Sequence, residues 1–206
     1  MSQFVTLGEI MLRLKSPGHE RFFQSPTFEA TFGGGEANVA VALANYGLEA
    51  GFISALPDND IGAAAIRELR GFGVDTQHIR RSGDRVGIYY LESGANQRPS
   101  KVVYDRAGSS ICQAQPGDFE WPEIFDGAKW LHITGITPAL GEHAQASVRA
   151  ACVAARRAGA TVLIYHEVRE LLSQGRDGDR RSGQEQAEQE RHGWGLGEEE
   201  NGAEAA

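Results

Sequence analysis

Hydrophobic and polar residues follow two kinds of spacing along the first 164 positions of the chain. Strand-type apolar runs alternate with segments whose apolar positions have helical spacing. The strand-type runs predict strands at residues 4–7, 10–14, 51–56, 130–133 and 161–164. The helical spacing predicts helices at about residues 36–46, 60–72 and 142–158. Such strand–helix alternation predicts an α/β fold built on a mostly parallel sheet.

Two further β-type segments, residues 86–92 and 101–106, are joined by a polar connection and predict a hairpin. Because alternate side chains of a strand share a face, Tyr104 and Arg106 point the same way. A guanidinium beside a phenol suits a carboxylate ligand, since arginine can bind both carboxylate oxygens at once. From the residues alone, a solvated arginine beside a packed tyrosine is favoured over a binding pair.

The alternating pattern ends after Tyr165. From residue 173 onward the chain consists mainly of Gln, Glu, Gly, Arg and Asp, and Leu196 is the only aliphatic residue larger than alanine. Such a segment cannot bury enough surface to offset the cost of ordering its backbone, roughly 1–2 kcal/mol per residue. We therefore expect a folded part over residues 1–164 and a disordered, acidic polar tail over residues 165–206.

With 206 residues, 41% of them apolar and 23% charged, the chain has the composition of a soluble globular protein. Its formal net charge of −8 disfavours nucleic acid as a partner, although the tail alone holds 11 acidic and 5 basic residues. No apolar run is long enough to cross a bilayer, and the N-terminus lacks the pattern of an export signal. Cys112 and Cys152 lack metal-type spacing. We expect a cytoplasmic protein without membrane contact.

Three consecutive glycines, residues 33–35, precede a predicted helix and are called the glycine loop below. Glycines let a ligand approach the backbone closely, and the start of the helix turns unpaired N–H groups toward that ligand. The loop lacks the lysine of a P-loop and the spacing of a dinucleotide-binding fingerprint. Phosphate binding, sugar-hydroxyl binding and a plain tight turn are all compatible with these residues.

The surroundings of the glycine loop carry a family resemblance. The run from residue 33 to Gly47, which begins Gly-Gly-Gly-Glu-Ala-Asn, resembles the N-terminal signature of the ribokinase-like (PfkB) carbohydrate kinases. Companion motifs lie before and after this run, in the family's order, across residues 4–164. They are Gly8-Glu9, Leu56-Pro-Asp-Asn-Asp-Ile-Gly62, Gly73-Val-Asp-Thr76 and Thr134-Gly-Ile136. Within the family, residues 8–11, residues 133–140 and the Gly-Gly-x-Glu-x-Asn form of the loop are most similar to 2-keto-3-deoxygluconate kinases.

The resemblance implies a ribokinase-like fold in which the hairpin at residues 86–106 forms a small β lid over the sugar. It also implies transfer of phosphate from ATP, with Mg²⁺, to a primary hydroxyl of a sugar acid, and it is compatible with a homo-oligomer formed through the lid. The substrate-binding residues that it implies are Gly34 and Asn38 for hydroxyls, Tyr89 and Tyr104 for the sugar body, Arg106 for the carboxylate and Ile136 behind the sugar. Alternatives are a neutral sugar or nucleoside as substrate, a non-catalytic sugar-binding fragment, and a product without function.

Other polar residues have competing interpretations. Asp58, Asn59 and Asp60 offer oxygens to a cation, but they precede a helix, so we favour Asn59 or Asp60 as its N-cap. Glu9 is compatible with contact to a substrate hydroxyl or with a satisfied structural acid. The six histidines show no ligand spacing, and His132, in a predicted strand, is interpreted as a packing residue. We predict no metal site.

The catalytic part implied by the resemblance is not found in this sequence. The family's base is an aspartate of a Gly-Ala-Gly-Asp type motif in the C-terminal half, and no such motif occurs here. Residues 175–179 are rich in Gly and Asp, but no apolar helix follows them, so they are not assigned this role. We therefore expect no catalytic residue and no ATP-binding half, because of a truncated or frameshifted reading frame. The strand at residues 161–164, internal in the family, is then expected to expose an apolar edge.

Overall fold

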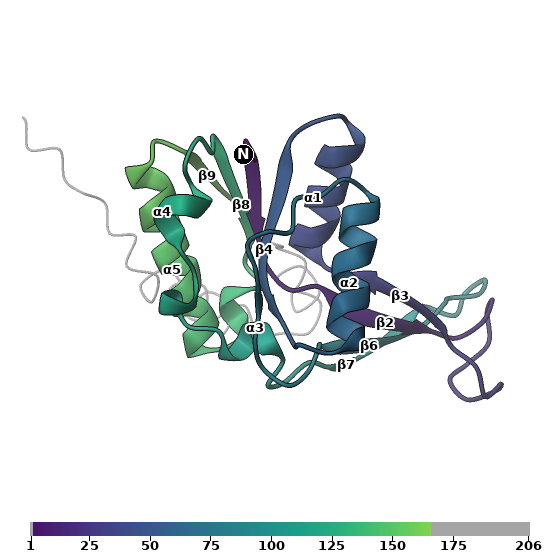
Figure 1. The fold of residues 1–206 in the computed structure, drawn as a ribbon. Helices are drawn as coiled ribbons and strands as arrows, with labels where there is room; N and C mark the ends of the chain where they lie inside the picture. The colour runs from purple at the N-terminus through teal and green to yellow at the C-terminus, as the bar shows by residue number, and fades with distance from the viewer. Residues whose placement is uncertain (1, 166–206) are drawn as a thin grey trace, which may run out of the picture. The chain divides into compact units, whose positions relative to one another are not determined.

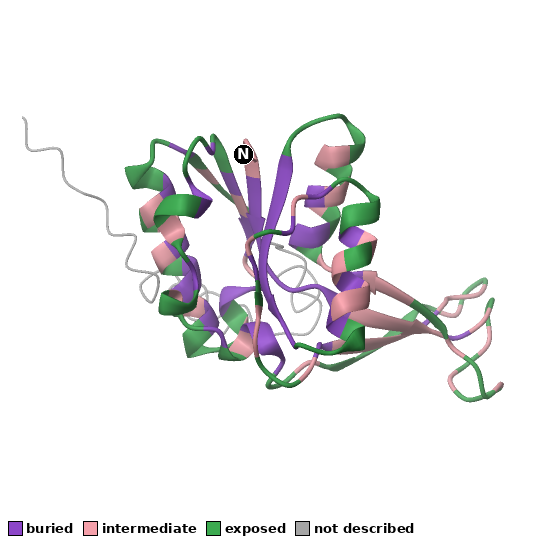
Figure 2. Cartoon of the chain, viewed as in Figure 1, coloured by how far each residue is buried: buried purple, intermediate pink, exposed green. Residues whose placement is uncertain are grey.

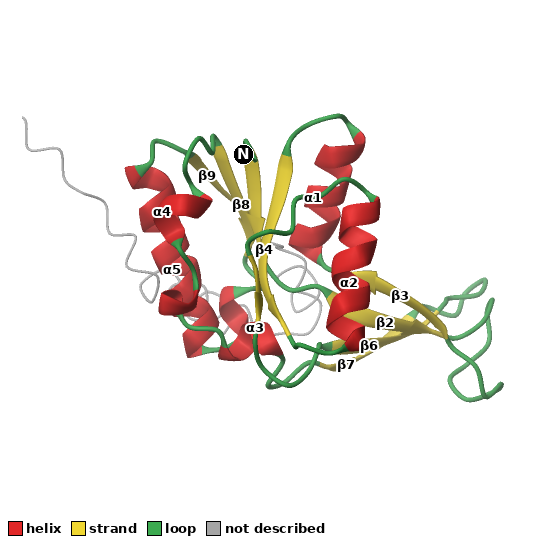
Figure 3. Ribbon diagram, viewed as in Figure 1, coloured by secondary structure: helices red, strands yellow, loops and turns green. Residues whose placement is uncertain are grey.

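The computed structural model describes residues 2–165. These residues form two β-sheets and the helices that pack on the larger one (Figures 1 and 3). None of the described helices is long and apolar enough to cross a membrane. The predictions made for the polar tail, namely its disorder and the absence of a role for residues 175–179, concern residues 166–206 and lie outside the described part.

The larger sheet has five parallel strands in the order β5-β4-β1-β8-β9. They are β1 (Phe4–Leu7), β4 (Ala50–Leu56), β5 (Ile79–Arg81), β8 (Trp130–Thr134) and β9 (Thr161–Tyr165). The predicted α/β class with a parallel sheet is confirmed. Strand β5 was not predicted, because it has only three residues and two of them are arginines.

Helices lie on both faces of this sheet, as Figure 1 shows. One face carries α1 (Gly35–Asn45) and α2 (Asp60–Gly71), and the other carries α3 (Ser110–Gln113), α4 (Trp121–Ile124) and α5 (Glu142–Arg157). Two short 3₁₀ turns, η1 (Pro116–Asp118) and η2 (Pro138–Leu140), precede α4 and α5. The three predicted helices correspond to α1, α2 and α5, and each end agrees to within one residue.

The smaller sheet has four strands in the order β3-β2-β6-β7 and extends away from the larger sheet (Figure 1). They are β2 (Met11–Lys15), β3 (Glu29–Gly33), β6 (Ile88–Glu92) and β7 (Lys101–Asp105). Strands β6 and β7 pair antiparallel, which confirms the predicted hairpin. Strand β2 pairs antiparallel with β3 and parallel with β6, so it joins the hairpin to the glycine loop at the end of β3.

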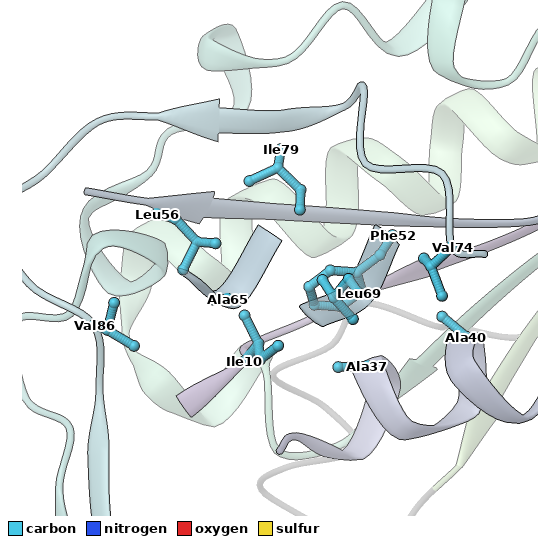
Figure 4. Close-up of a cluster of buried hydrophobic side chains, with 10 residues drawn as sticks. All are labelled: Ile10, Ala37, Ala40, Phe52, Leu56, Ala65, Leu69, Val74, Ile79 and Val86. Atoms are coloured by element: carbon cyan, nitrogen blue, oxygen red, sulfur yellow. The ribbon is translucent and has the colours of Figure 1, made fainter. Parts of the chain in front are cut away.

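The space between the larger sheet and helices α1 and α2 is filled by a hydrophobic cluster. Figure 4 shows Phe52 and Leu56 of β4 together with Leu69 of α2 and Ala37 of α1. Ile10, the residue before β2, belongs to the same cluster, so the base of the smaller sheet is anchored in the core. Buried residues lie along the strands and the inward sides of the helices (Figure 2). Burying one large apolar side chain is worth about 1.5–3 kcal/mol, so this core holds the strand ends in place.

Strand β9 forms one edge of the larger sheet and its side chains are largely exposed. Leu163, Ile164 and Tyr165 expose 52%, 40% and 58% of their surface. Within the described residues, no strand pairs with β9 on the side away from β8. The prediction that this strand presents an apolar edge is confirmed.

Candidate functional site

Segments from three parts of the chain meet at the carboxyl ends of β1 and β8, the two adjacent strands in the middle of the larger sheet. Strand β1 leads through β2 and β3 to α1 and β4 on one side, whereas β8 leads to α5 and β9 on the other. Ligands of open α/β sheets bind in the crevice where the connections diverge in this way. The segments that meet here are residues 8–9 after β1, the glycine loop before α1 and residues 135–137 after β8.

The glycine loop lies against the backbone that follows β1. Gly34 directly precedes α1, and a Cβ atom at this position would collide with the carbonyl oxygen of Glu9. A Cβ atom at Gly33 would lie 3.1 Å from the hydroxyl oxygen of Tyr89 in β6. Gly35 is exposed. The loop therefore joins the end of β1 to the smaller sheet and leaves the start of α1 open to a ligand.

Glu36, in the first turn of α1, ties the helix to the segment after β8. Its side chain is only 2% exposed, and its Oε1 atom accepts hydrogen bonds from Thr134 N (3.1 Å), Thr134 Oγ1 (2.7 Å) and Thr137 Oγ1 (2.6 Å). A Cβ atom at Gly8 would collide with the Glu36 carboxyl group. Three donors satisfy the buried charge, which would otherwise be costly. This role of Glu36 was not predicted from the sequence, although Glu36 is the glutamate of the Gly-Gly-x-Glu-x-Asn motif.

Two tyrosines and an arginine share one side of the smaller sheet. Tyr89 of β6 lies directly opposite Tyr104 of β7, and their ring centroids are 6.0 Å apart. The guanidinium carbon of Arg106 lies 5.6 Å from the centroid of the Tyr104 ring, within the range of a cation–π contact. Tyr104 is 60% exposed. The prediction that Tyr104 and Arg106 face the same way is confirmed. Tyr104 lies next to Tyr89, whose hydroxyl group is close to Gly33 of the glycine loop.

Arg106 also forms an ion pair with Glu9. Arg106 Nε donates to Glu9 Oε2 at 2.9 Å, Arg106 Nη2 donates to the same oxygen, and Ser109 Oγ donates to Glu9 Oε1 at 2.6 Å. The Glu9 side chain is 4% exposed. A Cβ atom at Gly87, just before β6, would collide with Glu9 Oε1. Of the two interpretations of Glu9, these contacts support the satisfied structural acid.

The two other predicted binding residues flank this arrangement. Asn38 lies one turn into α1, where its backbone N–H donates to Gly34 O at 2.8 Å and its side chain is exposed. Ile136 is 40% exposed, and its backbone N–H donates to Thr134 Oγ1 at 3.2 Å, so the Glu36 network holds it. Of the six predicted substrate-binding residues, Gly34 and Ile136 lie in the segments that meet at this end of the larger sheet, and Asn38 lies one turn into α1. The other three, Tyr89, Tyr104 and Arg106, lie in the smaller sheet or directly after it.

The polar residues at the start of α2 have a capping contact and an ion pair. Asn59 is the N-cap, and its Oδ1 accepts a hydrogen bond from Gly62 N at 3.0 Å. Asp58 pairs with Arg81 at 3.1 Å. Among the described residues, no group of three or more His, Cys, Asp or Glu side chains is placed to hold a metal ion. The prediction that Asn59 or Asp60 caps this helix is confirmed, with Asn59 as the cap.

His132 in β8 is a packing residue, as interpreted. Both of its ring nitrogens are shielded from solvent and have no hydrogen-bond partner among the described residues. Burial lowers the pKa of His132 below its ordinary value of 6.5, and the negative charge of Glu36 only partly opposes this effect. The imidazole is therefore neutral at pH 7.

The chain is similar to known proteins both in sequence and in structure. A profile of the pfkB family of carbohydrate kinases matches residues 1–174. The chain belongs to the PfkB family of carbohydrate kinases. A crystal structure of 2-dehydro-3-deoxygluconokinase from Thermotoga maritima is 52% identical and superposes with a TM-score of 0.78, covering 80% of this chain and 50% of the other. This match confirms the ribokinase-like fold class.

Two further proteins resemble this chain, one in sequence and one in fold. The 2-dehydro-3-deoxygalactonokinase of Haloferax volcanii is 37% identical over 161 residues, which are 78% of this chain and 50% of the relative. A putative ribokinase II from E. coli, solved in complex with ATP and Mg²⁺, is 18% identical, covers 80% of this chain and 52% of its own, and shares the fold with a TM-score of 0.70. This chain spans about half the length of the curated relatives that it matches.

Proposed function

We propose that this chain is the substrate-binding half of a kinase for a 2-keto-3-deoxy sugar acid, with 2-keto-3-deoxygluconate as the substrate. The observation that carries the proposal is that Tyr89, Tyr104 and Arg106 lie on one side of the smaller sheet beside the glycine loop. Relatives named 2-dehydro-3-deoxygluconokinase and 2-dehydro-3-deoxygalactonokinase support it, since 2-dehydro and 2-keto denote the same carbonyl group.

Each proposed binding residue has a chemical role in this arrangement. The backbone at Gly34 and the amide of Asn38 offer donors and acceptors to sugar hydroxyls. The rings of Tyr89 and Tyr104 cover the carbon skeleton, and Ile136 supplies an apolar contact behind it. Arg106 receives the carboxylate through the N–H groups that Glu9 leaves free, since a guanidinium carries five donors.

The proposed roles are limited to binding. Carbohydrate kinases of this family use ATP with Mg²⁺, which together supply and activate the phosphoryl group. The described residues contain no cluster of acidic side chains suited to Mg²⁺, so they do not fit this cofactor pair. We assign no catalytic residue. A cytoplasmic location and association of two copies through the hairpin at residues 86–106 belong to the same proposal.

The Arg106→Lys variant tests the substrate class. Lysine keeps a positive charge beside Glu9 but loses the planar fork that binds a carboxylate. We expect Kd for 2-keto-3-deoxygluconate, measured by titration calorimetry, to rise about tenfold, which corresponds to about 1.4 kcal/mol.

The matched ligand is 3-deoxyfructose, in which a hydroxymethyl group replaces the carboxylate. Its affinity should be the same for wild-type and Arg106→Lys. If wild-type protein binds 3-deoxyfructose as tightly as the acid, the neutral-sugar alternative is favoured instead. If it binds neither compound, the chain is not a binding half for either class.

A further inference from the structure

Four side chains form a row across all four strands of the smaller sheet. Arg13 of β2 pairs in register with Thr31 of β3 and with Tyr89 of β6, and Tyr89 pairs with Tyr104 of β7. Side chains at paired positions of neighbouring strands project from the same face, with Cβ atoms about 4.5–5.5 Å apart. Arg13 therefore shares the face of the two tyrosines that the proposed function places over the sugar.

Arg13 also lies close to the glycine loop. It is two residues from Met11, which pairs with Gly33 at the end of β3. Two residues of a strand span about 7 Å, so an arginine side chain at this position can reach a ligand bound at the glycine loop.

The charge of Arg13 is not neutralised by a direct contact. Its Nε atom donates to the neutral Thr31 Oγ1 at 2.8 Å, and no carboxylate among the described residues forms an ion pair with it. Lys15, two residues further along the strand, pairs with Glu29 at 2.8 Å. Lys15 is also the main cause of the lowered pKa of Glu29, to which Arg13 contributes least. The terminal N–H groups of Arg13 thus carry a positive charge that no carboxylate of the described residues contacts directly.

Arg106 differs from Arg13 in this respect. Its Nε and Nη2 atoms both serve Glu9 Oε2, so one edge of its fork is occupied and its charge is balanced by a buried carboxylate. A substrate carboxylate still meets the free N–H groups of Arg106, but it gains less net electrostatic attraction there than from a guanidinium without a carboxylate partner. A second guanidinium without a carboxylate partner supplies the missing charge.

We propose that Arg13 is a further substrate-binding residue that makes the site selective for an anionic sugar. This inference rests on the proposed function, because it places the sugar between the glycine loop and the row of tyrosines. Arg13 contacts the carboxylate of the bound acid through its terminal N–H groups, while Thr31 holds Nε and orients the guanidinium. The signal missed in the sequence was an arginine at the position that alternation places on the ligand-facing side of β2.

Calorimetric titration of the 206-residue chain, kept in solution by a fused carrier protein, tests the inference. The ligands are 2-keto-3-deoxygluconate and 3-deoxyfructose, and the variants are Arg13→Ala and Arg13→Gln. We expect both variants to raise Kd for the acid about tenfold and to leave Kd for 3-deoxyfructose unchanged, since charged hydrogen bonds contribute on this scale. The loss should shrink at high salt, because screening weakens the wild-type contact.

Lys15→Ala is the matched control, because Lys15 lies on the same face of β2 as Arg13 but two residues further from the end that pairs with the glycine loop. This variant should bind both ligands like wild-type protein. Acid binding by Arg13→Ala at wild-type affinity would overturn the inference while leaving the proposed function intact. An equal loss for both ligands, or an equal loss in Lys15→Ala, would also overturn it. Failure of wild-type protein to bind the acid would instead refute the proposed function.

Discussion

Glu36 shows how one buried carboxylate organises a site from distant parts of the chain. Its three donors belong to Thr134 and Thr137, which lie 98 and 101 positions further along the sequence. Thr134 Oγ1 donates to Glu36 and also accepts a hydrogen bond from the N–H of Ile136. This oxygen therefore links the start of α1 to Ile136, the residue proposed to lie behind the sugar. Removing this carboxylate would leave several buried donors without partners, each at a cost of about 1–3 kcal/mol.

His132 makes stability depend on pH. Burial lowers the pKa of His132 in the folded state below its ordinary value of 6.5, so below that value the unfolded chain binds more protons than the folded chain. This residue's contribution to stability is therefore complete above pH 6.5 and is lost as the pH falls toward the depressed folded-state pKa. Urea denaturation of wild-type protein at pH 7 and pH 5.5 should show a lower free energy of unfolding at pH 5.5.

The His132→Phe variant is the control for this prediction. Carboxylates titrate in both proteins, so only the difference between the two pH profiles reports on His132. The drop in stability should be smaller in the variant. Parallel profiles would show that His132 is not the group responsible.

Residues differ in how far their roles are predictable from the sequence. Capping by Asn59 or Asp60 is predictable because it depends only on the local sequence, namely a short polar side chain directly before an apolar helical pattern. The ion pair of Glu9 with Arg106 joins positions 97 apart, and no local pattern encodes it. For the same reason the residues alone left Glu9 open between a substrate contact and a structural acid.

Among the secondary-structure elements, helices α1, α2 and α5 and the β6–β7 hairpin are predictable from periodicity because their hydrogen bonds are local or join neighbouring segments. Strand β3 was missed, since its sequence Glu-Ala-Thr-Phe-Gly holds only one large apolar residue and ends in the glycine loop. The parallel pairing of β2 with β6 joins segments more than 70 residues apart. It depends on tertiary packing rather than on the sequence of either strand.

The exposed edge strand β9 is expected to promote association. An unpaired edge without charged side chains can pair with another chain, and a single lysine blocks such pairing. We expect Leu163→Lys to raise several-fold the fraction of the chain that stays in solution after centrifugation.

The control for this variant is Phe72→Lys, which places the same charge on an apolar residue that is 47% exposed and lies outside any strand. It should change solubility little. An equal gain in both variants would point to net charge, and no gain in Leu163→Lys would show that β9 is not the site of association.

At the scale of the whole molecule, the chain spans about half the length of the curated relatives that it matches, and its 206 residues lack the Gly-Ala-Gly-Asp type motif of the family's base. The proposed binding residues lie at the carboxyl ends of β1 and β8 and on the adjoining smaller sheet, and the described residues hold no cluster suited to Mg²⁺. In a coupled assay with 2-keto-3-deoxygluconate, we expect no sugar-dependent consumption of ATP by this chain alone. A full-length relative assayed in parallel is the positive control, and measurable turnover by the chain would contradict the prediction.

The contacts of Glu9 have a mechanical consequence for the smaller sheet. Strand β2 begins two residues after Glu9, Gly87 before β6 touches its carboxyl group, and Arg106 after β7 is bound to it. Three of the four strands are thus attached around one buried side chain, which itself continues from the central strand β1. A rotation of the smaller sheet relative to the larger one would therefore pivot near Glu9, and it would displace the outer end of the sheet more than the tyrosines next to the pivot.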